Sequence, residues 1–275
     1  MKKISLLMLP VMALSLVSCE KNNGELSGDD VIEFKDPNFL KALLVVQEGY
    51  IYDAATDDNI PYLMNVDANK DGAITVNEAR NVKGLFLNNV RTYESFNISE
   101  MPEIKYFTSL THLDCNNNDL TSLDVSHNTA LRTLYCGDNQ LTSLDVSHNT
   151  ALQSLLCTVN QLTSLDVSNN PYLTALDCGY NQFTSLDMSN NPYLTYLYCR
   201  NNQLTSLYVG SCPDLVELNC NDNQLTSLDV HYNRELKYLS CSNNPLEKLI
   251  IYADNEISGM DDIESEYGDI IEYEY

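Results

Sequence analysis

A repeat of 21 residues runs through the second half of the chain and limits the folds that the chain can adopt. Cysteine fills one column of this repeat, asparagine fills another without a break, and leucine fills three more. A unit this short cannot bury a core alone, because only stacked neighbours cover its apolar side chains. The sequence therefore predicts an elongated solenoid. The two columns are Cys115, Cys136, Cys157, Cys178, Cys199, Cys220 and Cys241, and Asn118, Asn139, Asn160, Asn181, Asn202, Asn223 and Asn244.

Each unit reads LxxLxCxxNxL, as in the segment from Leu131 to Leu141. This is the leucine-rich repeat signature, in which alternate residues of a short strand point inward and the asparagine amide satisfies backbone groups at the next turn. The other half of each unit, such as Leu141 to Asn149, predicts a second short strand or an extended segment. We therefore expect a β-rich leucine-rich repeat solenoid, a right-handed superhelix of the β/α type with short 21-residue coils, and a small α-helical N-terminal cap.

The first residues have the pattern of an export signal. Lys2 and Lys3 precede an apolar run from Ile4 to Val17, and Cys19 follows it closely. This run of 14 residues is shorter than the ~20 that a membrane-spanning helix needs. The pattern resembles a bacterial lipoprotein signal, in which Cys19 carries the lipid; an ordinary secretory signal that contains a cysteine is the alternative.

The predicted division of the whole chain is a lipoprotein signal peptide at 1–18, a flexible tether at 19–30, an N-terminal cap at 31–101, the solenoid at 102–251 and an acidic C-terminal cap at 252–275.

The segment from Asp67 to Glu78 has the spacing of an EF-hand calcium loop. Calcium prefers six to eight oxygen ligands, and Gly72 permits the sharp turn that the loop needs. Pro61 lies where a complete EF-hand has its entering helix, so we expect an irregular approach and only an exit helix, near residues 76–82. A polar surface loop without a metal is the alternative. The predicted cofactor is Ca²⁺, and the predicted ligands are Asp67, Asn69, Asp71, the Ala73 carbonyl, Thr75 and Glu78.

The segments that flank the repeats are less regular. A helix is predicted from about residue 37 to 47, because Asp36 can cap it, Pro37 suits its first turn and apolar residues follow at helical spacing. At the other end, residues 252–275 hold nine acidic and no basic side chains. They predict a degenerate last coil and a polar cap.

The cysteine column has two interpretations. Export would place the thiols in an oxidising compartment, where disulfides form. However, each cysteine takes an inward position beside leucine, where a thiol behaves as a small apolar side chain, and in-register neighbours on parallel strands direct their Cβ atoms poorly for a bridge. We therefore expect buried free thiols. Cys212 replaces an asparagine of a second column and is expected at a turn.

An aspartate column recurs between the inward residues of the second segment. Stacked like charges repel unless they are hydrated, hydrogen-bonded or bridged by a cation. A solvated face is expected here, with a cation ladder as the alternative. The column is Asp124, Asp145, Asp166, Asp187 and Asp229.

Charge and motifs restrict the function. The chain has 39 acidic and 15 basic side chains, a net charge of −24, which opposes binding to nucleic acid. It contains no HExxH, GxSxG, GxGxxG or phosphate-loop motif, and no motif brings together a nucleophile, a base and an orienting group. An enzyme is therefore not expected.

The whole arrangement resembles leucine-rich repeat lipoproteins of Bacteroidota-type bacteria with an N-terminal EF-hand-like calcium loop. The resemblance rests on the signal cysteine, the opening Phe34 to Phe39, the loop that ends in Glu78-Ala79, and repeats of the form LTSLDVSxNxxLxxLxC. It implies a surface-exposed outer membrane lipoprotein that acts as a binding protein or adhesin, and it brings no catalytic residue.

Outward positions of the cysteine-bearing strands differ from coil to coil, whereas TSLDVS in the other half is nearly constant. Variation of this kind favours a binding face over the alternative, a spacer or stalk of the cell envelope with no defined ligand. Tyrosine and arginine dominate binding hot spots, although tyrosines here could also stack only to stiffen the sheet.

The expected partner is a protein or a glycan. The chain is expected to bind it as a monomer that touches the membrane only through its lipid. The predicted ligand-binding residues are Tyr135, Leu156, Asp177, Tyr196, Tyr198, Arg200 and Tyr238.

Overall fold

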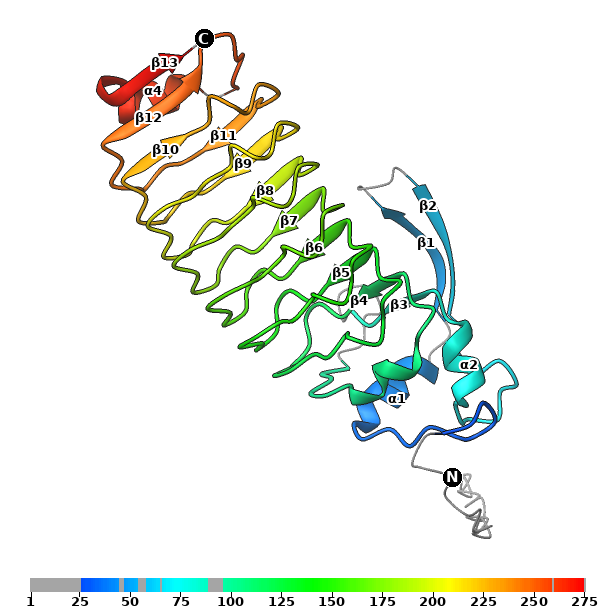
Figure 1. The fold of residues 1–275 in the computed structure, drawn as a ribbon. Coiled ribbons are helices and arrows are strands. Elements are labelled where there is room, and N and C mark those ends of the chain that lie inside the picture. The colour runs from blue at the N-terminus through cyan, green and yellow to red at the C-terminus, as the bar shows by residue number, and fades with distance from the viewer. Residues whose placement is uncertain are drawn as a thin grey trace, which may run out of the picture.

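The protein is an elongated solenoid with a cap at each end, seen in a computed structural model (Figure 1). The structure describes residues 26–44, 47–53, 58–64, 66–88, 96–258 and 260–274, and for 47–53, 58–64, 261 and 262 it describes the backbone alone. The predicted signal peptide and Cys19 therefore lie outside the described residues. In the described part of the chain, no helix is long and apolar enough to cross a membrane.

One parallel sheet of eight short strands runs along the solenoid, in the order β11-β9-β8-β7-β6-β5-β4-β3. From β4 onward, adjacent strands pair in steps of 21 residues, so that Leu134 pairs with Leu155 and Leu155 with Leu176. The predicted leucine-rich repeat solenoid is thus confirmed. Its first strand, β3, lies within the range that the sequence predicts as the cap. The strands are β3 (Gly84–Phe86), β4 (His112–Asp114), β5 (Thr133–Tyr135), β6 (Ser154–Leu156), β7 (Ala175–Asp177), β8 (Tyr196–Tyr198), β9 (Glu217–Asn219) and β11 (Tyr238–Ser240).

The core is one continuous stack of leucine and cysteine side chains. The central leucine of each strand and the cysteine that follows it are buried, as Leu155 and Cys157 show with no exposed surface. Phe183 and Met188 take a leucine and a valine position in the same coil and are also fully buried. Stacking therefore supplies the core that a single coil lacks.

The half of each coil that carries the TSLDVS segment forms the side away from the eight-stranded sheet, here called the convex side. It is extended in most coils and forms strands near the C-terminal end. There β10 (Ser227–Asp229), β12 (Lys248–Tyr252) and β13 (Ile271–Glu274) make a second parallel sheet, and Asp187 makes a single bridge to Tyr208. The sequence predicts either a second short strand or an extended segment on this side, and the extended segment is the more common of the two.

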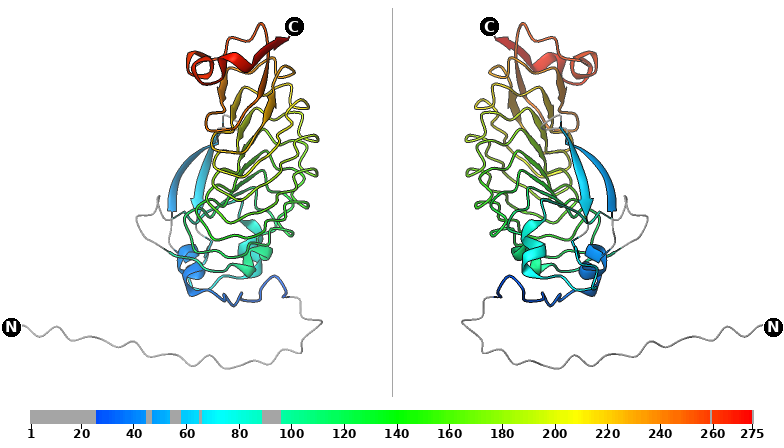
Figure 2. Two further views of the ribbon diagram at one scale, coloured as in Figure 1. Left: turned by 90° about the vertical axis from the view of Figure 1, so that its left-hand side faces the viewer. Right: turned by 90° about the vertical axis from the view of Figure 1, so that its right-hand side faces the viewer.

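The N-terminal cap contains two short helices and a hairpin. Helix α1 (Pro37–Leu44) begins as predicted but ends three residues early, because strand β1 (Gln47–Asp53) starts where the predicted helix would end. Strand β1 pairs antiparallel with β2 (Asp58–Met64), and this hairpin, absent from the prediction, stands beside the sheet (Figures 1 and 2). Helix α2 (Val76–Asn81) confirms the predicted exit helix, and the 3-10 helix η1 (Pro102–Tyr106) leads into the repeats.

The C-terminal cap closes the stack with a helix rather than with a full coil. Helix α4 (Met260–Tyr267) is followed by the 3-10 helix η2 (Gly268–Ile270) and β13. The Tyr267 hydroxyl donates to the carbonyls of Cys241 (3.2 Å) and Asn244 (3.1 Å) and accepts from the Asn244 amide (3.2 Å). It thus takes the Cys241 carbonyl that the asparagine of a further coil would otherwise take.

Candidate functional site

The asparagine column, here called the asparagine ladder, fixes the position of each strand. Asn160 is typical: its Oδ1 accepts from the Leu141 amide at 2.9 Å, and its Nδ2 donates to the carbonyls of Cys136 (3.0 Å), Cys157 (3.1 Å) and Thr158 (3.3 Å). One side chain therefore ties two neighbouring coils together. This arrangement agrees with the predicted role of the asparagine at the turn.

The strand face, meaning the solvent side of the eight-stranded sheet, carries the predicted ligand residues. Strand pairing places Tyr135, Leu156, Asp177 and Tyr198 side by side on four adjacent strands. Tyr196 lies on the same face with 39% of its surface exposed, whereas the four column members are half-buried or nearly so. Tyr238 is separated from Tyr196 by Glu217, so these two rings are not neighbours. The predicted set thus forms one surface, with Tyr238 at its C-terminal edge.

The middle of the strand face is electrostatically unusual. Burial raises the pKa of Asp177, although a hydrogen bond from the Gly179 amide and the charge of Arg200, 4.0 Å away, act in the opposite direction. Burial and the neighbouring Glu217 raise the pKa of Tyr198 well above its usual range. These groups are partly desolvated before any partner arrives, which favours specific polar contacts.

The cysteine column consists of buried free thiols, as predicted. Burial raises the pKa of Cys199 and of Cys241 to about 12, which keeps both thiols neutral and unreactive. Cys212 follows a turn, as expected, but it is fully buried, and its thiol donates to the Met188 carbonyl at 3.8 Å.

The aspartate column on the convex side is hydrogen-bonded locally. Asp145 accepts from the Ser147 amide at 2.9 Å, and Asp124, Asp166 and Asp187 repeat this contact. Hydrogen bonds from the serine two residues later lower the pKa of Asp145. Each carboxylate is therefore stabilised within its own coil, which agrees with the solvated face and needs no bridging cation.

The predicted calcium loop folds around its carboxylates. Asp67 accepts from the amides of Gly72 (2.8 Å) and Asp71 (3.2 Å), and Gly72 has φ +83°. Glu78 accepts from the amides of Ala68 (3.0 Å) and Thr75 (2.9 Å), and so joins the two ends of the loop. Burial opposes ionisation of Glu78, but the hydrogen bonds from Thr75 and Ala68 outweigh it and lower its pKa.

The donor atoms of this loop are the hard oxygens that calcium prefers. Asn69 and Asp71 are exposed, and the Asn69 amide donates to Asp71 at 2.9 Å. Among the residues that the structure describes, no three acidic, histidine or cysteine side chains are grouped closely enough to hold a metal ion. Calcium would therefore require these carboxylates to turn toward a common point.

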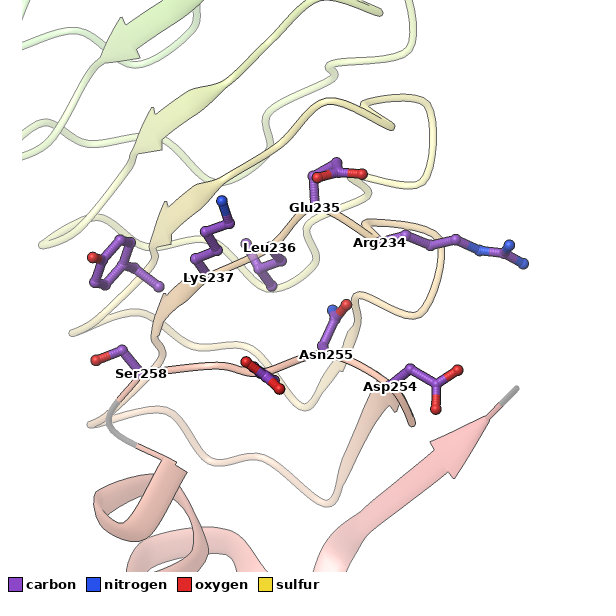
Figure 3. Close-up of a pocket in the computed structure, with 9 residues that line it drawn as sticks. Arg234, Glu235, Leu236, Lys237, Asp254, Asn255 and Ser258 are labelled. Atoms are coloured by element: carbon purple, nitrogen blue, oxygen red, sulfur yellow. The ribbon is translucent and has the colours of Figure 1, made fainter.

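An open pocket of about 400 Å³ lies near the C-terminal end, where the chain leaves the repeat pattern. The segments 234–238 and 254–258 run side by side there, joined by hydrogen bonds from Ser258 to Lys237 (2.7 Å) and from Asn255 to Asn233 (3.1 Å) (Figure 3). Its lining mixes Arg234 and Lys237 with three carboxylates. Sequence patterns do not indicate this pocket, because it forms where the repeat decays and only Ile257 of the second segment still falls on a leucine column.

Comparisons with known proteins agree with the fold. A family model of two leucine-rich repeats matches residues 108–148 and 192–233. The functional domain of InlJ from Listeria monocytogenes, which includes a cysteine ladder, is 34% identical and has a TM-score of 0.67; the alignment covers 82% of this chain and 46% of that one. YopM from Yersinia enterocolitica is 28% identical, with a TM-score of 0.51, over 62% of this chain and 35% of that one.

A third structure, internalin C2 from Listeria monocytogenes, is 19% identical and shares the fold, with a TM-score of 0.59, over 88% of this chain and 94% of that one. No curated protein matches the chain. The chain is therefore a leucine-rich repeat protein. It is similar to the internalins, and it spans about half the length of the InlJ domain, at 46%.

Proposed function

We propose that the chain is a lipid-anchored cell-surface binding protein, with the role of an adhesin, that binds a protein or a glycan through its strand face. The observation that supports this proposal is the contrast between the two sides of the solenoid. The convex side repeats TSLDVS almost unchanged, whereas outward positions of the strands change from serine and alanine to tyrosine, leucine and aspartate. A stalk without a ligand, the alternative, gains nothing from such variation. The similarity to internalins is consistent with binding rather than catalysis.

The strand face is tested with the double variant Tyr198→Ala and Arg200→Ala. Aromatic and arginine anchors contribute most to binding, so affinity for a partner recovered by pull-down or glycan array should fall tenfold or more, ~1.4 kcal/mol. Calorimetry measures the affinity, and thermal unfolding should change little. The control is Tyr208→Ala, which removes a tyrosine with 58% exposure from the convex side. Equal affinity of the double variant and the wild type would place the binding site elsewhere.

The lipid anchor is tested through Cys19, the residue that the signal pattern selects. Mature wild-type protein should partition into the detergent phase, because acyl chains on the cysteine outweigh the charge of a strongly acidic protein. Cys19→Ser should remain in the aqueous phase. If both forms partition alike, the chain has no lipid at this residue.

A calcium ion bound at Asp67 to Glu78 would stabilise the cap. The loop connects directly to α2, and Val76 donates a backbone hydrogen bond to Asp30 at 3.1 Å, so ordering the loop also orders the cap. Calorimetry should show one site in the wild type, and calcium should raise the melting temperature. Asp67→Ala and Glu78→Gln should each abolish both effects, whereas Asp29→Ala, outside the loop, should not. An unmodified protein that shows neither effect would refute the site.

A further inference from the structure

A residue with positive φ follows each cysteine of the repeat, one position before the ladder asparagine. We call this set the corner column. Its φ angles lie between 51° and 57°, in the left-handed region that few side chains adopt readily. The column is Asn117, Asp138, Val159, Tyr180, Asn201, Asp222 and Asn243.

Two adjacent members of this column have side chains that disfavour its left-handed backbone conformation. Asparagine and aspartate tolerate the left-handed region, and they occupy five of the seven positions. Val159 and Tyr180 have φ of 52° each, and a β-branched or bulky side chain at such an angle is strained. Strain of this kind is found at ligand contacts, where the side chain is retained for another reason.

Packing does not supply that reason. Val159 and Tyr180 keep 43% and 48% of their surface exposed, so neither fills the core. Polar members of the column instead make side-chain hydrogen bonds, from Asn201 to Asp222 (3.4 Å) and from Asn243 to Asp222 (2.9 Å). Burial in the core therefore does not explain an exposed pair on a strained backbone.

Tyr180 is also held in place. The Arg200 guanidinium lies 5.5 Å from the centre of its ring, and Asp177 lies 4.0 Å from the same guanidinium. Gly179 leaves room for the Arg200 stem, because a Cβ there would come within 3.2 Å of the Arg200 Cγ. Tyr180 thus continues the strand face at Asp177 and Arg200 and presents a fixed aromatic surface next to Val159 on the preceding coil.

The charges around the pair indicate the chemistry of a partner. Asp138 lies one coil before Val159 and Asp222 two coils after Tyr180, and both carboxylates are exposed. Arg200 is compensated by Asp177. The net charge of −24 means that a second copy of the chain would be repelled.

We propose that Val159 and Tyr180 anchor a peptide segment of a partner protein. The apolar side chains of this segment are flanked by lysine or arginine. The proposal rests on the proposed binding function.

The test selects phage-displayed random peptides on the full chain and measures their affinity for variants. Recovered peptides should combine apolar and basic residues, bind more weakly as salt rises, and lose tenfold or more in affinity for Val159→Asn with Tyr180→Asn. The same variant should melt at a higher temperature than the wild type, because asparagine relieves the backbone strain. Tyr208→Asn, on the convex side, is the matched control and should leave affinity unchanged.

Other outcomes separate this inference from the broader function. Peptides that lose affinity only for Tyr198→Ala with Arg200→Ala would overturn the role of the corner pair and keep the strand face. Binding on a glycan array alone, or peptides without basic residues, would overturn the proposed partner and keep a binding protein. Recovery of no peptide together with no partner for the strand face would overturn both.

Discussion

Asn160→Ala should lower the stability of the protein by about 3 kcal/mol, since it leaves the buried Leu141 amide without an acceptor and removes a donor to three carbonyls. For a chain of this size, such a loss corresponds to a fall of about 6 °C in melting temperature. Circular dichroism during heating and urea unfolding both measure the effect. The large expected size follows from the buried position of the side chain between two coils, where it bonds backbone groups of both.

The matched control is Asn169→Ala in the next half of the same coil. Asn169 is exposed on the convex side, so its removal should change stability by no more than about 0.5 kcal/mol. Similar destabilisation by both substitutions would mean that asparagine content, and not the ladder, supports the solenoid.

The cysteine column should react with a thiol reagent about a thousandfold more slowly in the native protein than in urea. Reaction requires a thiolate at the surface, and these thiols are buried with raised pKa values, so modification must wait for the solenoid to open. The measurement uses Cys19→Ser protein and an aromatic disulfide reagent near pH 8. Asn169→Cys, which introduces one exposed thiol, should give one fast equivalent. Rapid reaction of several native thiols would show that the column is accessible.

The same burial gives the stability a defined dependence on pH. The pKa of Cys199 rises from about 8.5 in the unfolded chain to about 12 in the fold, so the folded state holds its proton more tightly. The contribution of the buried Cys199 thiol to the free energy of unfolding is complete below pH 8.5 and is lost as pH rises toward 12. Melting temperatures measured from pH 7 to pH 10 should therefore fall at the alkaline end.

The solenoid could be predicted because its information is repeated in the sequence. Seven copies of the cysteine and asparagine columns specify the strand register, and the structure pairs the strands in those steps. The exit helix was equally accessible, since Thr75 and Glu78 form a capping box that is visible as a local pattern. The predicted strand-face residues were found on one surface for the same reason: period-two alternation determines their direction.

The unrepeated segments could not be predicted in this way. Strand β2 contains Pro61, which suggests an interruption rather than a strand, and helix α4 has only three apolar side chains, Met260, Ile263 and Tyr267, in a mostly acidic sequence. Helix α4 docks through buried Ile263 and Tyr267 and through the Tyr267 hydroxyl, all of them tertiary contacts. The corner column did leave a sequence signal. Its asparagine and aspartate residues are types that favour positive φ, so Val159 and Tyr180 stand out as exceptions.

The spacing of the ladder also determines how the length of such a chain can change. The ladder bonds between coils join residues 19 or 24 positions apart, as from Leu141 to Asn160 and from Asn160 to Cys136. Excision or duplication of one whole coil therefore leaves each remaining asparagine with the same kinds of partner. The distance from the N-terminal cap to the Val159 and Tyr180 pair can therefore be adjusted in increments of about 4.8 Å, while the pair itself stays intact.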